Sequence, residues 1–462
     1  MNSKIMSQKF QVDMDLILKY NQPGPRYTSY PTAPNFSSDI GWPQFEKSLQ
    51  DGHTSNRDLS LYFHLPFCAK LCYFCGCTML VTRNRDRIKD YVDYIIKEMS
   101  ILSAAAGKRR VSQIHWGGGT PTYLSPDETS KLIDAIHANY DVAPDAEISI
   151  EVDPREVTPE HYKRLRAGGF NRLSIGVQDF YEPTQKAINR IQPEALTIQN
   201  VEQSREAGFE SVNLDLIYGL PHQTVKTFAD TLGKIIAIRP DRIALFSYAH
   251  VPWMKKHQNI IKDEWMPKPE EKLRILKYAI ECLTESGYAF IGMDHFALPE
   301  DSLTIASKNK TLYRNFQGYS THADCDLLGH GMSSISQTAD VYAQSTKSFD
   351  GYYAAVDGQT CPIERGYKLD SEDQLRREVI VRLMCDFSLN FRAIEKRFNI
   401  DFKSCFDEEL ARLDGFVLDG LLTLDSDGIE IKGMGKLLIR NIAMTFDKFL
   451  QQKSSTRFSK TI

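Results

Sequence analysis

The sequence FCAKLCYFCGCTML at residues 67–80 contains four of the nine cysteines in the chain, Cys68, Cys72, Cys75 and Cys77. Successive cysteines in it are four, three and two residues apart. The other five cysteines stand singly in the sequence, as is typical of small buried residues. The chain therefore concentrates its thiols in one short segment, and what that segment binds is the first question.

Three kinds of site could use this segment. Structural zinc takes four ligands, which the four cysteines could supply, although such sites commonly join two separated pairs of ligands. A cubane iron–sulfur cluster is large enough for a short loop to place three thiolates on three irons, which leaves the fourth iron free. A redox or structural role is the third alternative. The spacing favours iron–sulfur and leaves zinc and the redox role open.

The composition excludes several classes of protein. With 56 basic and 60 acidic residues, the formal charge is -4, which gives no overall field for nucleic acid or anionic lipid. The first twenty residues lack the uninterrupted apolar run of a secretion signal, and no run of about 18 apolar residues could cross a bilayer. An odd number of mostly scattered cysteines does not indicate a disulfide framework. We expect a cytoplasmic protein without a membrane or nucleic-acid partner.

Short strand-like runs alternate along the chain with longer helical patterns. A helix is expected from about residue 85 to 102, and another after Ser125, with Pro126 and Glu128 as starting signals. The strand-like runs lie at 59–65, 112–116, 147–152, 172–178, 211–220 and 242–250. Six β-α units predict an α/β fold with a parallel sheet, arranged as a partial (β/α)6 barrel of TIM-like type.

Unusual polar residues follow these strands. They comprise the cysteine segment, the triple glycine 117–119, Glu151, Gln178, Asp215 and residues 248–250. In a barrel the carboxyl ends of parallel strands meet at one face, which carries the active site. The sequence therefore predicts chemistry along one rim of the barrel.

The chain divides into four expected parts. Residues 1–57 hold a stretch rich in proline, which predicts an extended N-terminal arm over the active site. The barrel is expected at 58–300 and a connecting, barrel-completing segment at 301–370. Residues 371–462 read as a mainly α-helical domain with helices at 371–387, 391–398 and 407–416 and a hairpin turn at Asp427 and Gly428. This last domain resembles a winged helix, but its many acidic residues favour a structural or covering role over DNA binding.

The C-x3-C-x2-C spacing directly after a strand resembles the signature of radical S-adenosylmethionine enzymes. GGGTPT at 117–122 resembles their glycine-rich segment, where the absence of Cβ lets backbone groups approach the cofactor. Over nearly the whole chain the sequence resembles the oxygen-independent coproporphyrinogen III oxidase family of haem synthesis. Supporting stretches are PRYTSYPTA (25–33), SIGVQDF (174–180), LDLIYGLP (214–221), GMDHFALPED (292–301) and NFQGYST (315–321).

The resemblance implies the positions of the cofactors. Cys68, Cys72 and Cys75 match the ligands of one 4Fe-4S cluster. Residues matching positions around its S-adenosylmethionine are Tyr62, Gly118, Glu151, Ala249 and Ile335. Residues matching positions around a second S-adenosylmethionine are Phe74, Cys77, Gly119, Thr120, Gln178, Arg190 and Asp215. No catalytic residue beyond these cofactor sites is implied.

The resemblance also implies the reaction. A 5′-deoxyadenosyl radical would remove hydrogen from the β-carbon of propionates of coproporphyrinogen III, and loss of CO2 with transfer of one electron to an acceptor would leave the vinyl groups of protoporphyrinogen IX. The electron donor and acceptor are unidentified, and a monomer is expected. A haem chaperone or haem-degrading relative is the alternative, but the chaperone typically lacks the RYTSYP stretch and has an aromatic residue at the position of Cys77. A zinc-binding module is the third hypothesis.

Individual residues also have simpler interpretations. Glu151 and Asp215 could cap helices, and Arg190 could be a solvated helical charge. Tyr62 and Phe74 could be plain core aromatics. His64 and His115 are expected to be packed, hydrogen-bonded histidines instead of metal ligands. Arg26 could bind a substrate propionate through its guanidinium or could simply be solvated.

Overall fold

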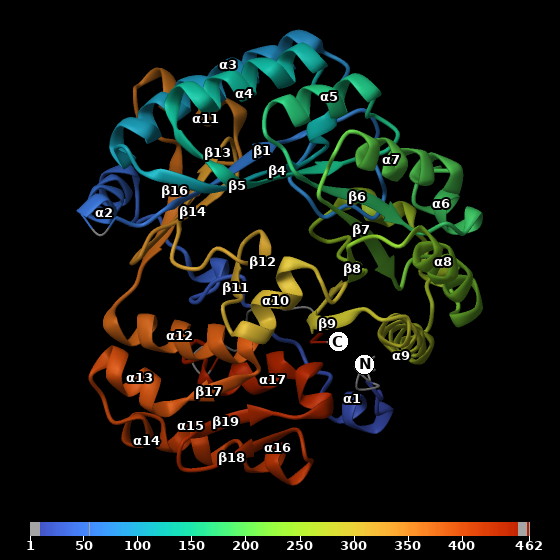
Figure 1. The fold of residues 1–462 in the computed structure, drawn as a ribbon, viewed down its shortest axis with the longest axis vertical. Coiled ribbons are helices and arrows are strands. Elements are labelled where there is room, and N and C mark those ends of the chain that lie inside the picture. The colour runs from blue at the N-terminus through green and yellow to red at the C-terminus, as the bar shows by residue number, and fades with distance from the viewer. Residues whose placement is uncertain (1–9, 55, 451–459, 462) are drawn as a thin grey trace, which may run out of the picture.

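The computed structural model describes residues 10–54, 56–450 and 460–461 (Figure 1). Parts of the expected arm and of the C-terminal domain, and the first nine residues of the N-terminal stretch searched for a secretion signal, lie outside these ranges. Within them, no helix is both long enough and apolar enough to cross a membrane.

A twelve-stranded sheet forms the centre of the described chain, in the order β16-β15-β14-β13-β1-β4-β5-β6-β7-β8-β10-β9. Its middle strands are parallel. They are β1 (Leu59–Leu65), β4 (Arg110–Gly118), β5 (Asp141–Val152), β6 (Arg172–Gln178), β7 (Ser211–Tyr218), β8 (Arg242–Ser247) and β13 (Asp326–His330). The six predicted strands are thus confirmed, and the end strands β16 and β9 do not pair, so the barrel is partial.

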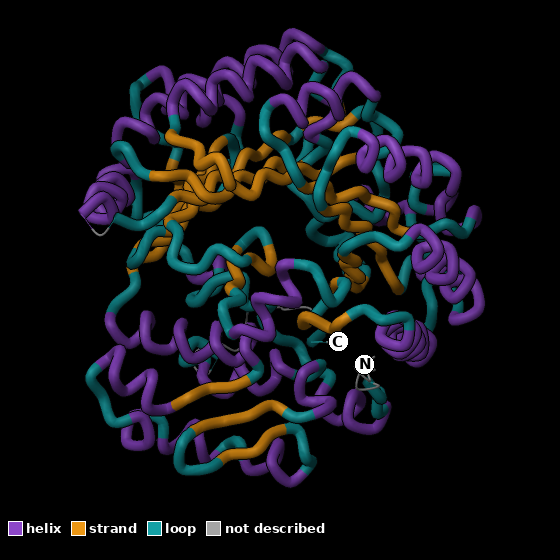
Figure 2. The backbone as a smooth tube through the Cα atoms, in the orientation of Figure 1, coloured by secondary structure: helices purple, strands orange, loops and turns teal. Residues whose placement is uncertain are grey.

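Helices cover the outer face of this sheet (Figure 2). They are α3 (Arg85–Ala106), α4 (Pro126–Asn139), α5 (Pro159–Ala167), α6 (Glu182–Ala187), α7 (Glu194–Glu206), α8 (Val225–Ile238), α9 (Pro269–Glu285) and α11 (Phe349–Asp357). The predicted start of α4 is confirmed, because Ser125 and Glu128 form a capping box.

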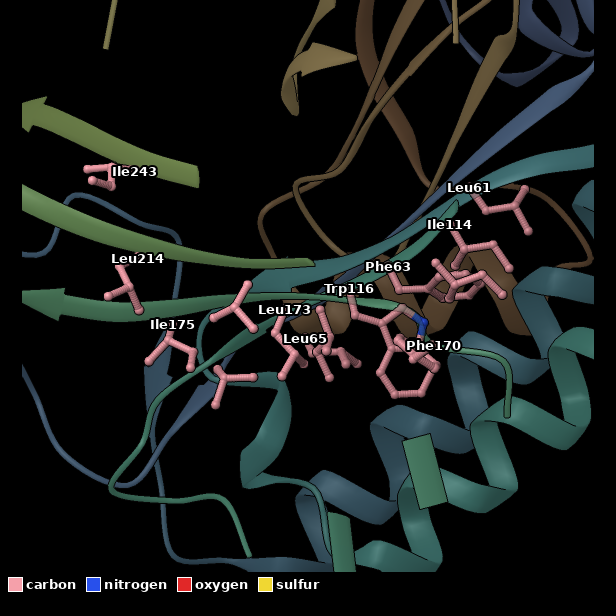
Figure 3. Close-up of a cluster of buried hydrophobic side chains, with 14 of the residues drawn as sticks. Leu61, Phe63, Leu65, Ile114, Trp116, Phe170, Leu173, Ile175, Leu214 and Ile243 are labelled. Atoms are coloured by element: carbon pink, nitrogen blue, oxygen red, sulfur yellow. The ribbon is translucent and has the colours of Figure 1, made fainter. Parts of the chain in front are cut away.

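The alternation of side chains along each strand separates a dry face from a polar one. Leu61, Phe63 and Leu65 of β1 are fully buried and lie between the strands and the helices, with Trp116 and Phe170 beside them (Figure 3). The side chains that alternate with these buried ones along each strand face the inside of the barrel. Burial of the outer face therefore fixes the register that directs polar groups inward.

The sheet continues past β1 through strands that the sequence analysis missed. β13 pairs in parallel with β1, with Leu59 opposite Asp326. Antiparallel strands extend both edges: β14 (Ile335–Gln337), β15 (Val341–Ser345) and β16 (Ile363–Lys368) on one side, β9 (Ala289–Gly292) and β10 (His295–Ala297) on the other. The parallel part of the sheet thus has seven described strands instead of six.

The N-terminal arm is only partly extended, which corrects the expectation. It contains α1 (Met14–Tyr20), a 3-10 turn (Ala33–Asn35) and α2 (Trp42–Thr54). Asp13 caps α1 by accepting the N–H groups of Asp15 and Leu16. Phe45 and Leu49, four residues apart, are both fully buried, so α2 forms by burying one face.

The C-terminal part is a layer of helices on a small sheet of three described strands, ordered β17-β19-β18. Its elements are α12 (Ser371–Asp386), β17 (Ser388–Asn390), α13 (Phe391–Phe398), α14 (Phe402–Cys405), α15 (Asp407–Ala411), α16 (Asp414–Leu418), β18 (Leu422–Leu424), β19 (Gly428–Ile431) and α17 (Ile439–Ala443). The predicted hairpin is present, and Asp425 accepts the N–H groups of Asp427 and Gly428 in its turn. The helix expected at 407–416 is instead two short helices.

A second hydrophobic core belongs to this part and reaches across to the arm and the barrel. It includes Tyr27 and Tyr30 of the arm, Ile291 of β9 and Leu303 of α10 (Ser302–Asn309). This part of the arm therefore packs between the barrel and the C-terminal part, which are the two layers seen in Figure 1. A short hairpin, β11 (Tyr313–Asn315) and β12 (Gly318–Ser320), lies in the same region.

Candidate active site

The cysteine segment forms a loop at the carboxyl end of β1. Two short strands, β2 (Phe67–Cys68) and β3 (Leu80–Val81), pair in parallel and close its base. On one side, the Tyr73 N–H donates to the Ile188 carbonyl at 2.9 Å. On the other side, the Gln258 amide donates to the Phe74 carbonyl at 2.9 Å. Bonds to the backbone thus hold the loop and leave its thiols free to face inward.

The loop and the strand ends enclose a cavity of about 250 Å³. Twelve of the fifteen predicted site residues line it: Cys68, Cys72, Cys75, Cys77, Phe74, Gly118, Gly119, Thr120, Glu151, Gln178, Arg190 and Asp215. They come from six different segments between residues 68 and 215. The cysteine segment and the ends of β4, β5, β6 and β7 therefore meet at one cavity, whereas residues 248–250 of the predicted rim do not line it.

The three remaining predicted residues do not line the cavity. The Tyr62 ring stacks on His115, and its burial next to Glu151 and Cys77 raises its pKa well above the usual value. Ala249 accepts the same Gln258 amide that binds the Phe74 carbonyl. Ile335 is separated from Tyr62 by β13, in which Gly329 pairs with Tyr62 and lies against the Ile335 carbonyl.

Each of the three predicted ligand thiols has its own hydrogen-bond donors. The Thr120 hydroxyl lies 3.4 Å from the Cys68 sulfur. The Arg155 and Arg190 guanidinium groups lie 3.5 and 3.7 Å from the Cys72 sulfur. The Cys77 backbone N–H lies 3.4 Å from the Cys75 sulfur. Such donors stabilise thiolates and tune a cluster bound to them.

This donor set fits an iron–sulfur cluster better than a single metal ion. Among the described residues, no three His, Cys, Asp or Glu side chains converge closely enough to hold one ion. The thiolates of a cubane bind different irons and need not converge. Two guanidinium groups lie near the Cys72 sulfur, and their positive charges would offset the negative charge of a cluster bound to thiolates. The residues therefore fit a 4Fe-4S cluster on Cys68, Cys72 and Cys75, and the zinc interpretation finds no support in the geometry.

The triple glycine is required by close backbone packing. Gly118 has a φ of +109°, and a Cβ there would lie 2.6 Å from the His64 ring. A Cβ on Gly119 would lie 2.6 Å from the Pro66 carbonyl carbon. Neither position can carry a side chain without a shift of its neighbours. The backbone of these glycines is thus exposed to the cavity, where a ligand can reach it.

Two acidic side chains in the cavity differ in their protonation. Burial would raise the pKa of Glu151, but hydrogen bonds from His115 and the Gly118 N–H lower it below the usual value. Burial and the negative charge of Glu151 raise the pKa of Asp215 to about 7, against hydrogen bonds from Ser174 and Asn213. Glu151 is therefore the charged acceptor of the pair near neutral pH.

Arg190 is held rigidly and is only 6% exposed. It donates to Asp153 at 2.9 Å and to the Gly176 carbonyl at 2.6 Å. The interpretation of Arg190 as a solvated helical charge is therefore wrong. His64 and His115 are hydrogen-bonded side chains as expected, with partners Thr78 and Ser149.

Several residues of the cavity wall were not predicted from the sequence. They are Lys70, Met79, Pro121, Val152, Asp153, Arg155, Ser174, Gly176, Ile217 and Phe246. Asp153 and Arg155 directly follow Glu151 in EVDPRE, so their position after a strand was a usable signal. No motif in the sequence marked the inward-facing residues Ser174, Ile217 and Phe246 as part of the cavity wall.

Two family models match the chain. The model described as the radical SAM superfamily matches residues 62–235. The model described as the HemN C-terminal domain matches residues 369–438. The first match contains the cysteine loop and most of the cavity wall.

Full-length relatives share one name. The oxygen-independent coproporphyrinogen III oxidase of Escherichia coli (strain K12) is 48% identical over 98% of this chain and 99% of its own length. That of Synechocystis sp. is 46% identical over 97% of both chains. That of Pseudomonas aeruginosa is 44% identical over 97% of this chain and 98% of its own.

One solved structure is similar over almost the whole chain. It is described as coproporphyrinogen III oxidase (HemN) from Escherichia coli, a radical SAM enzyme. The TM-score is 0.92 at 46% identity, covering 96% of this chain and 100% of that one.

Proposed function

Since this chain belongs to the oxygen-independent coproporphyrinogen III oxidase family of radical S-adenosylmethionine enzymes, we propose how its own residues serve that oxidation. The enzyme is an oxidoreductase of haem biosynthesis that converts propionates of coproporphyrinogen III to the vinyl groups of protoporphyrinogen IX. The observation that carries the residue assignments is the single cavity that twelve predicted residues line.

Cys68, Cys72 and Cys75 would hold the 4Fe-4S cluster. When bound, the cluster and S-adenosylmethionine together supply a carbon radical able to take hydrogen from a propionate. Thr120, Arg155 and the Cys77 N–H would keep the three sulfurs oriented and their negative charge compensated.

The remaining cavity residues would hold two S-adenosylmethionine molecules. Tyr62, Gly118, Glu151, Ala249 and Ile335 would surround the first, where the charged Glu151 is a strong hydrogen-bond acceptor. Phe74, Cys77, Gly119, Thr120, Gln178, Arg190 and Asp215 would surround the second. Arg190 is fixed in advance by Asp153 and Gly176, so little of its freedom would be lost on binding.

The arm and the C-terminal part would keep water from the radical. Tyr27 of the arm donates to Asp447 at 2.9 Å, and Tyr30 packs edge-on against Phe449. Such a cover over a barrel rim protects a reactive intermediate from solvent. The division into an arm at 1–57, a barrel at 58–300, a connecting segment at 301–370 and a C-terminal domain at 371–462 is part of this proposal.

The test is an anaerobic assay of the reconstituted full chain. With reductant, S-adenosylmethionine, coproporphyrinogen III and an added one-electron acceptor, we expect 5′-deoxyadenosine, CO2 and protoporphyrinogen IX. The control is the triple variant with Cys68, Cys72 and Cys75 changed to Ser, which should form none of them. A chain that binds iron and sulfide but only transfers or opens haem would support the alternative relative. A colourless chain with one zinc would overturn the proposal.

The cytoplasmic location and the monomeric state expected from the sequence stay predictions. The electron donor and acceptor also stay unidentified. Any donor must reach the cysteine loop, where Gly76 and Cys77 are exposed to solvent.

A further inference from the structure

Three arginine side chains surround one carboxylate where the arm meets the barrel and the C-terminal part. Arg26 of the arm forms an ion pair with Asp294, in the turn between β9 and β10. Arg314 of β11 donates to the Arg26 carbonyl at 3.4 Å. Burial lowers the pKa of Arg440 of α17, and the charges of Arg26 and Arg314 near it lower this pKa further. Segments distant in sequence thus bring positive charges to one point.

The positive charge of this group exceeds the charge of Asp294. Arg440 is compensated by backbone dipoles, because it donates to the carbonyls of Gly24, Pro25, Lys460 and Thr461. Arg26 is compensated by Asp294 itself. Arg314 has no carboxylate partner among the described residues. A buried guanidinium without an anion is costly, so the group favours an added negative charge.

Arg314 also has an unused donor. Arg314 is 4% exposed, and its guanidinium carbon lies over the Tyr319 ring, 4.8 Å from the ring centre. Its Nη1 atom is buried and has no hydrogen-bond partner in the described part of the chain. The Nδ1 atom of His295 is also buried and unpartnered in the described part of the chain, and it is a donor in the tautomer that carries the proton on Nδ1. Buried donors without acceptors are rare and point to a ligand that supplies one.

One residue of the group, His295, lies one aromatic ring from the active-site cavity. His295 packs edge-on against Phe246, with ring centres 6.1 Å apart, and Phe246 lines the cavity. Tyr319, under Arg314, packs edge-on against the other side of His295 at 5.4 Å. A molecule in the cavity is therefore separated from His295 by one ring, and Arg314 lies farther along the same row of packed rings, over Tyr319.

From these contacts we infer that Arg314, Arg26 and His295 form a subsite for a carboxylate of the substrate. The inference rests on the proposed function, because the carboxylates of coproporphyrinogen III are its propionates. A guanidinium binds a carboxylate through two parallel hydrogen bonds, so Arg314 and Arg26 can anchor one propionate. This anchor fixes the macrocycle while another propionate reacts. Asp294 keeps Arg26 in place and competes for it.

A purely structural role of the group makes a different prediction. If the arginines only hold the arm against the barrel, loss of the Asp294 carboxylate removes the ion pair with Arg26. A ligand bound near the arm should then bind more weakly. If they form the subsite, Asp294→Asn frees Arg26 and adds net positive charge, so a carboxylate ligand binds more tightly. The sign of this effect separates the two roles.

The test is equilibrium binding of coproporphyrin III, the aromatic form with the same propionates, to the anaerobically reconstituted full chain. The shift of the Soret band reports binding. Arg314→Met and Arg26→Met should each weaken it by about 10- to 100-fold, the loss expected for a charged hydrogen bond. Asp294→Asn should tighten it. The control Arg57→Met removes an ion pair with Asp326 and should leave it unchanged.

Two further measurements keep the inference separate from the proposed function. Cleavage of S-adenosylmethionine by dithionite-reduced Arg314→Met, without substrate, should equal that of the wild type. Its absence in the wild type would contradict the proposed function instead. If Arg314→Met does not hold its cluster, Arg314→Lys is the replacement variant. It keeps the positive charge but loses the two parallel donors of the guanidinium, so it should bind coproporphyrin III with intermediate strength. Unchanged binding by the arginine variants, or weaker binding by Asp294→Asn, would overturn the subsite.

Discussion

Tyr352 of α11 donates its phenolic hydrogen to the carboxylate of Glu98 of α3, over 2.6 Å. The same oxygen of Glu98 accepts the Gly331 N–H, directly after β13, at 2.7 Å. Glu98 is 1% exposed, and this burial raises its pKa to about 7 although both hydrogen bonds lower it. One buried acid thus joins two helices to the strand that extends the parallel sheet.

This acid makes stability depend on pH. Because its pKa is raised in the folded chain from 4.5 to about 7, the folded chain holds a proton that the unfolded chain releases in that window. The free energy of unfolding therefore falls as the pH rises from 4.5 to 7, by about 3 kcal/mol. The side chain introduced by Glu98→Gln is neutral at every pH, and its carbonyl oxygen can still accept the hydrogen bonds from Tyr352 and Gly331. The variant should therefore not show this fall in the free energy of unfolding.

Urea unfolding of both proteins at pH 5 and pH 8 measures the effect. The stability of Glu98→Gln relative to the wild type should increase by about 2–3 kcal/mol between the two pH values. Other groups titrate equally in both proteins and cancel in the difference. A difference that does not change with pH would show that Glu98 is ionised in the folded chain at pH 5.

The parallel strands and the site rim could be predicted because both have local signals. Each of the six strands is an apolar run that buries a face against helices, as Leu61, Phe63 and Leu65 do. The polar residues at the ends of these strands then share an edge by geometry alone. Glu151 and Asp215 could be placed together on this argument before any contact was known.

The missed elements depend on distant partners. β13 has five residues, and its place in the sheet is set by pairing with β1, about 267 positions earlier in the chain. No local pattern encodes such a pairing. The same holds for Phe246, whose alternation along β8 points it into the cavity, and for Arg314, whose unused donor is apparent only beside Tyr319.

The four cysteines of the loop should differ in their effect on the cluster. Single changes of Cys68, Cys72 and Cys75 to Ser should each abolish stable 4Fe-4S binding, because each removes one thiolate ligand. Cys77→Ser should keep iron and sulfide, since the backbone N–H still donates to the Cys75 sulfur and the Ser hydroxyl can replace the thiol of Cys77 as a donor to it. Iron and sulfide analysis with absorption spectra of the four variants checks this. Loss of iron from Cys77→Ser would show that Cys77 is itself a ligand of the cluster and would contradict the prediction.

Two glycines of the site should respond differently to a methyl group. Gly119→Ala places a Cβ within 3 Å of the backbone of Pro66 and Phe67, which cannot move without shifting the cysteine loop. We expect a loss of about 1–3 kcal/mol in stability and a weakened cluster. Gly76→Ala is the control, because nothing lies within 4 Å of its added Cβ. Thermal unfolding and iron content of both variants measure the contrast, and equal behaviour would contradict it.

Glu151 should determine the affinity for S-adenosylmethionine. Glu151→Gln keeps an acceptor for the Gly118 N–H at 3.1 Å but loses the charge that lies in the cavity. Because hydrogen bonds to a charged acceptor are stronger than those to a neutral one, we expect binding to weaken by about tenfold. Equilibrium dialysis of the reconstituted chain measures it. Glu147→Gln, on the same face of β5 but paired with Arg172, should bind like the wild type. Equal affinities for both variants would exclude Glu151 from the site.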